Sequence, residues 1–98
     1  MPYIHPDLRK PLDDSILHLR AKLNLFAEGD EQEAGILNYT ITSLLEPWLC
    51  DGVTYRDVNM LVGVLECVKL ELYRRAAAPY EDKKLKENGD VVTYKEIE

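Results

Sequence analysis

The sequence predicts an all-α fold, a small antiparallel bundle of three helices that functions as an oligomer. Apolar residues recur at three- and four-residue steps over most of the 98 residues, and glycines and prolines separate these stretches. Such spacing places apolar side chains on one face of a helix. We expect a single domain with a helical core at 13–78, an extended N-terminal arm at 1–12 and a charged C-terminal tail at 79–98.

The first helix is expected at about 13–27, with an N-cap from Asp13-Asp14. Prolines remove a backbone donor and disfavour helix in the residue before them, so the segment before this helix should be extended. That segment contains Pro2, Pro6 and Pro11. The apolar face of the helix consists of Ile16, Leu19, Leu23 and Phe26.

The second helix should begin after Gly29, where Asp30 and Glu33 have the spacing of a capping box. Its apolar stripe is Ala34, Leu37, Ile41, Leu44, Leu45 and Trp48. Pro47 is expected to close the last turn.

The third helix is expected at about 55–78, capped by Thr54 with Asp57 three residues later. Its core stripe is Val58, Leu61, Val62, Leu65, Val68, Leu72 and Ala76, and further apolar side chains occupy its other faces, namely Met60, Val64, Cys67 and Leu70. A helix that is apolar nearly all round should be buried nearly all round. Two partner helices cannot cover it, which favours symmetric self-association. We expect Pro79 to end this helix.

Two local patterns leave alternatives open. Gly63 inside the third helix indicates a close approach to the backbone, either by tight helix packing or by a ligand or second subunit. Asn88-Gly89 is a tight-turn signal, and residues 91–94 have strand propensity. This end of the chain either pairs with the extended N-terminus, pairs with a neighbouring subunit or remains disordered.

The composition restricts the class of partner. Eighteen acidic and twelve basic residues give a net charge of −6, which speaks against binding of duplex nucleic acid. No run reaches the length of a membrane span, and Cys50 and Cys67 lie in apolar stretches, which predicts buried, reduced thiols. We therefore expect a soluble cytoplasmic protein that associates with itself, with no cofactor and no metal.

The candidate ligand site is the densest group of guanidinium and aromatic side chains. Arg74 and Arg75 can grip a phosphate while Tyr73 and Tyr80 stack a base. The alternative is that both arginines only stabilise a helix C-terminus. Further candidate wall residues are Asn38 and Tyr39, from a polar stretch of the second helix, and Glu66 on the Gly63 face.

Signatures of an enzyme are mostly absent. The chain has no glycine-rich phosphate loop and no paired-cysteine metal spacing. All-α nucleotide pyrophosphohydrolases bind magnesium through acidic pairs, and Glu66 with Glu71 is the nearest approach to such a pair. Their E-x-x-E and E-x-x-D pattern is missing from the helices, so we expect no catalytic residues.

Several motifs together resemble a known family. They are the stretches Leu37-Asn38-Tyr39, Tyr55–Asn59, Gly63–Cys67, Glu71–Arg75, Pro79–Lys83 and Asn88–Asp90. This pattern resembles an uncharacterised family of roughly hundred-residue proteins of tailed phages and bacteria. The resemblance implies a phage or prophage setting, with the host cytoplasm as compartment, and no assigned activity.

Two functions follow as expectations, and an all-α nucleotide pyrophosphohydrolase-like enzyme is a third alternative. The leading one is a non-enzymatic homo-oligomer that sequesters a small anionic, nucleotide-like ligand at a pocket shared between subunits. The alternative is an interaction or scaffold protein without a small-molecule ligand.

Overall fold

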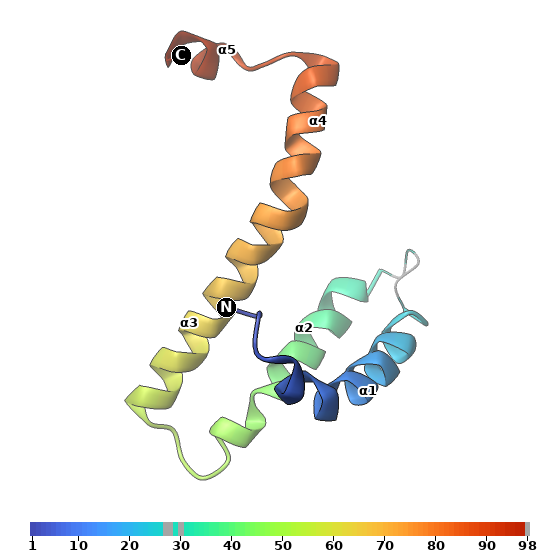
Figure 1. The fold of residues 1–98 in the computed structure, drawn as a ribbon, viewed down its shortest axis with the longest axis vertical. Coiled ribbons are helices and arrows are strands. Elements are labelled where there is room, and N and C mark those ends of the chain that lie inside the picture. Colours follow the sequence, from blue (N-terminus) through green and yellow to red (C-terminus); the bar gives the residue numbers. More distant parts are fainter. Residues whose placement is uncertain (27–28, 30, 98) are drawn as a thin grey trace. The chain divides into compact units, whose positions relative to one another are not determined.

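The computed structural model describes residues 1–26, 29 and 31–97. Every regular element in this part of the chain is a helix, which confirms the all-α class (Figure 1). In chain order the elements are α1 (Pro6–Leu23), α2 (Glu33–Leu44), the 3-10 turn η1 (Glu46–Trp48), α3 (Tyr55–Leu72), the π turn η2 (Tyr73–Ala77), α4 (Ala78–Asn88) and α5 (Val92–Ile97). The chain divides into two units, residues 2–62 and residues 63–98 with Met1, and each is described by itself.

Helix α1 begins earlier than the sequence predicted. The expected extended arm at 1–12 is wrong beyond His5, because Pro6 occupies the first helical turn, where its missing N–H is no loss. The side chain of His5 caps the helix by accepting a hydrogen bond at Nδ1 from the backbone N–H of Asp7, at 3.1 Å. Pro11 lies inside the helix. The arm is tied to it by the Nε of Arg9, which donates to the carbonyl of Ile4 at 2.7 Å.

Helix α2 begins at Glu33, after the N-cap residue Gln32. The expected cap Asp30 lies outside the described residues. The helix ends at Leu44, and Pro47 lies in the 3-10 turn that follows, as its sequence position indicated.

Helix α3 begins as predicted. The hydroxyl of Thr54 accepts a hydrogen bond from the backbone N–H of Asp57 at 3.1 Å and donates to its Oδ2 at 2.9 Å. This reciprocal pair satisfies one of the free donors of the first turn and confirms the predicted cap.

The helix does not end at Pro79, contrary to the sequence-based expectation. The backbone continues through η2 into α4 without a break, so 79–98 is not a simple tail (Figure 1). At the C-terminus of α4, the N–H of Gly89 donates to the carbonyl of Leu85 at 2.8 Å, and Gly89 adopts a φ of +83° that favours glycine. The turn at Asn88-Gly89 therefore ends a helix, and Val92, Thr93 and Tyr94, which have strand propensity, belong instead to the helix α5.

Few side chains are buried. Among the described residues, only Leu61 on α3 is buried, at 7% exposed. The expectation that Cys50 and Cys67 are buried is wrong for the single chain, since both are free and exposed. Nothing in the described residues lies within 4 Å of the place a Cβ would take at Gly63, so the expected close approach does not come from packing within these residues.

Candidate functional site

Three of the predicted ligand residues lie in one π turn. Tyr73, Arg74 and Arg75 belong to η2, and Tyr80 follows in the first turn of α4. The cause of the wide turn is Pro79, which has no N–H and whose ring would collide with the carbonyl four residues earlier in an α-helix. In η2 the N–H of Ala78 reaches back five residues to the carbonyl of Tyr73, and the turn accommodates the proline.

Acidic side chains contact two of these residues directly. Nη2 of Arg74 lies 2.7 Å from Oε1 of Glu71, one helical turn before it. The hydroxyl of Tyr73 donates to Oε2 of Glu81 at 3.3 Å, a bond that spans the π turn. The structure thus groups the basic and aromatic residues with carboxylates that already engage some of their donors.

The electrostatic field at Tyr73 is negative. The charge of Glu81 is the main cause that raises the pKa of the Tyr73 phenol above its ordinary value of 10.0, followed by the hydrogen bond from the same pair. Desolvation and the charges of Tyr94 and Asp82 act in the same direction. A negative field at this hydroxyl disfavours an anion beside it.

The ring of Tyr80 has a cation near it, from Lys84 of the same helix, α4. Nζ of Lys84 is 5.7 Å from the ring centroid, within the range of a cation–π interaction. At an exposed site such a contact contributes about 0.5–1 kcal/mol. The ring is 61% exposed, so most of its surface is open to a partner.

Asn38 and Tyr39 lie in the other unit, on α2. The hydroxyl of Thr42 donates to Oδ1 of Asn38 at 3.2 Å. An open groove of about 530 Å³ runs along this face, lined by Ala34, Gly35, Asn38, Tyr39 and Thr42. Asn38 and Tyr39 therefore line a shallow groove on α2.

Glu66 forms a surface ion pair. Its Oε1 lies 3.2 Å from Nζ of Lys69, three residues later on α3. Both side chains are largely exposed, so the pair contributes at most a fraction of a kcal/mol.

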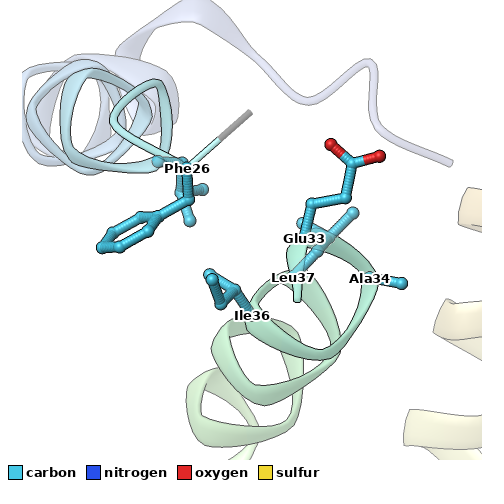
Figure 2. Close-up of a pocket in the computed structure, with 6 residues that line it drawn as sticks. Phe26, Glu33, Ala34, Ile36 and Leu37 are labelled. Carbon is cyan, nitrogen blue, oxygen red and sulfur yellow. The ribbon is translucent and has the colours of Figure 1, made fainter. Parts of the chain in front are cut away.

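An apolar hollow lies where the end of α1 meets α2. It measures about 290 Å³ and is lined by Leu23, Phe26, Glu33, Ala34, Ile36 and Leu37. Figure 2 shows Phe26 on one side and Ile36 and Leu37 on the other, with the carboxylate of Glu33 turned away from Phe26. Leu23, Phe26 and Leu37 belong to the predicted apolar helix faces, whereas Ile36 was not predicted to lie on one.

The carboxylate partners of the arginine–tyrosine cluster were also missed. The spacing of three residues between Glu71 and Arg74 is a regular signal for an ion pair on a helix and was available in the sequence. The bond between Tyr73 and Glu81 had no such signal, because it depends on the π turn.

The residues that the structure describes also bear on metal binding and on membrane insertion. No three histidine, cysteine, aspartate or glutamate side chains gather there as metal ligands would. None of the helices described combines the length and the apolar character that crossing a bilayer requires.

Fold and site together define a small all-helical chain with apolar faces uncovered and a mixed arginine, tyrosine and glutamate cluster. Residues 1–91 match a family described as a domain of unknown function (DUF6899), and the chain belongs to that family. No curated protein and no solved structure matches the chain. Membership confirms the resemblance to an uncharacterised family, whereas the phage and bacterial setting stays a prediction.

Proposed function

We propose that this protein is a non-enzymatic, homo-oligomeric interaction protein, whose helices complete their apolar core only by packing against further copies of the chain. The observation that carries the proposal is burial. Apolar residues of all its helices are exposed, and Leu61 is the one buried side chain in the described residues.

The accessible surface gives this observation a magnitude. The chain exposes 9032 Å². A compact folded protein of 98 residues, about 11 kDa, exposes about 5,700 Å². Even if the two units were separate compact bodies, they would expose about 6,900 Å² together, by the same scaling. The chain therefore exposes roughly 2,100–3,300 Å² more than a self-sufficient fold of its size.

This surplus corresponds to the interface of an obligate oligomer. A standard interface buries about 800 Å² per partner, and obligate ones bury more and are more apolar. In such an assembly α1, α2 and α3 would form the predicted antiparallel bundle, with apolar faces shared between copies. The cytoplasmic compartment remains part of the proposal.

The test is the oligomeric state of the purified chain. We expect light scattering coupled to size-exclusion chromatography to give a molar mass above that of one chain at micromolar concentration. Unfolding should depend on chain concentration, because dissociation accompanies it. A monomer that unfolds cooperatively at high temperature, independently of concentration, would refute the proposal.

A second function, sequestration of a small anionic nucleotide-like ligand, is favoured by one observation. Arg75 has no ion pair or hydrogen bond with the part of the chain that the structure describes, so its guanidinium fork is available to a phosphate. Arg75, in η2, precedes by five residues the exposed Tyr80 in the first turn of α4.

Calorimetric titration of cyclic dinucleotides, cyclic trinucleotides and ADP-ribose derivatives tests this second function. If Arg74 and Arg75 clamp a phosphate, replacing both with glutamine should weaken binding by about 1.5–3 kcal/mol for each lost charged hydrogen bond. Absence of heat with every compound, for a folded wild type, would refute ligand binding and leave the interaction role in place.

A further inference from the structure

One apolar row runs without interruption from α3 through the π turn into α4. We name it the α3–α4 seam, and it consists of Leu65, Val68, Leu72, Ala76 and Tyr80. In an uninterrupted α-helix, the seven-residue repeat of Leu65, Val68 and Leu72 would continue to Arg75. The π turn accommodates one additional residue, so the row passes to Ala76 and Tyr80 while Arg75 turns away from it.

The described residues leave the seam uncovered. Leu65 is 38% exposed, Val68 57%, Leu72 64% and Tyr80 61%, and Ala76 is exposed as well. The row extends about 22 Å along the helix, at 1.5 Å per residue. Because these side chains are exposed, they contribute to the surplus surface of the chain.

The seam alternates large and small side chains. Leu65 and Leu72 occupy one set of heptad positions, and the smaller Val68 and Ala76 occupy the other. In an antiparallel helix pair each set faces the other set, so Leu65 would meet Ala76 of a second copy, and Leu72 would meet Val68. A parallel pair would instead place Ala76 against Ala76 and leave a void, which is destabilising.

We propose that the α3–α4 seam is the contact through which two copies of this chain pair in antiparallel orientation, about a two-fold axis that crosses the seam midway between Val68 and Leu72. A surface that is complementary to itself under reversal is what an isologous two-fold contact requires. This pairing rests on the proposed oligomeric function, since it specifies the surface by which the oligomer forms.

Cysteine cross-linking tests the pairing in a background where Cys50 and Cys67, both free thiols, are replaced by serine. We expect a mixture of the Leu65→Cys and Ala76→Cys chains to form a covalent dimer on mild oxidation. Neither variant should cross-link with itself at a comparable rate. The matched control is Leu70→Cys, exposed on the opposite face of α3, which should remain monomeric on denaturing gels even when mixed.

A charge placed on the seam provides a second measurement. Leu72→Asp should raise the dissociation constant of the oligomer by about 30-fold or more, the loss typical of a central interface residue. Leu70→Asp, similarly exposed in the single chain, should change it by less than about fivefold. Helix content is compared by circular dichroism at chain concentrations above the dissociation constants of both variants, because unfolding accompanies dissociation of the proposed oligomer. At these concentrations the two variants should have the same helix content.

The outcomes separate the two proposals. Self-cross-linking of Ala76→Cys, or equal effects of the Asp variants at 70 and 72 on a wild type that is oligomeric, would overturn the antiparallel seam and leave the oligomeric function standing. A monomeric wild type would overturn both.

Discussion

Replacing Gly63 with alanine should stabilise the protein. Gly63 lies in the middle of α3, and in the described residues no heavy atom lies within 4 Å of the position of the added Cβ. Glycine inside a helix is about 0.5–1 kcal/mol less stable than alanine, because it loses more backbone freedom on folding. For a domain of this size, that gain corresponds to a rise in melting temperature of about 2–8 °C.

The assay is thermal unfolding followed by circular dichroism at a fixed chain concentration, with the molar mass measured by light scattering. Gly52→Ala is a matched control, because its Cβ would also meet open space but the backbone φ of +116° strains any L-residue. That variant should be destabilised by about 1 kcal/mol or more.

A lower melting temperature or altered molar mass for Gly63→Ala would refute the reasoning. It would show that another chain approaches the backbone of α3 at this point, as the sequence pattern suggested. Gly63 is on the side of α3 away from the α3–α4 seam, so the proposed pairing predicts that even Gly63→Leu assembles normally.

Two further predictions concern contacts that the structure shows directly. Thr54→Ala removes the side-chain cap of α3 and should lower the free energy of unfolding by about 1 kcal/mol, measured by thermal melting, whereas Thr54→Ser should retain most of it. An unchanged melting point for Thr54→Ala would mean that this cap does not limit stability. Glu81→Gln should lower the pKa of Tyr73, visible as earlier phenolate absorbance in an alkaline titration, because the carboxylate that raises this pKa is removed. Since the folded-state pKa lies above the ordinary value of 10.0, the stabilisation by the neutral phenol is present below pH 10 and is lost as the pH rises through the raised pKa. A titration curve identical to that of the wild type would show that the bond to Glu81 is not formed in solution.

The start of α3 was predicted correctly, whereas α1 begins at Pro6 and not at the predicted residue 13. The pair Thr54 and Asp57 predicted the start of α3 because the cap is local, with both partners three residues apart. The apolar periodicity likewise predicted three long helical segments in the correct order.

Prolines were interpreted too strictly. Pro6 fits the first turn of α1, and Pro79 is accommodated by a π turn, so neither prevents helix. The rule that proline ends a helix depends on a lost hydrogen bond and a steric collision, and both are avoided where the turn is wide or the N–H would be free anyway.

Burial could not be predicted from helix faces alone. The apolar character of α3 indicated that Cys67 and the glycine face would be covered, yet coverage depends on which surfaces meet. The arginine cluster shows the same limit, because its carboxylate partner Glu81 reaches Tyr73 across a turn whose width the sequence did not reveal. Glu81 also places a negative charge beside this cluster, which disfavours a bound anion there.

Because α3 and α4 are joined by a π turn, the number of residues in that turn determines which side chains of α4 align with the apolar row of α3. Pro79 would still require the wide turn after deletion of one residue such as Ala77, so the residues after the deletion would rotate by about 100° relative to α3. Tyr80 would then leave the row that begins at Leu65, although the composition of the helix would hardly change. A one-residue deletion at this position would therefore be more damaging than most single substitutions nearby, because it changes the direction of a whole helix rather than one side chain.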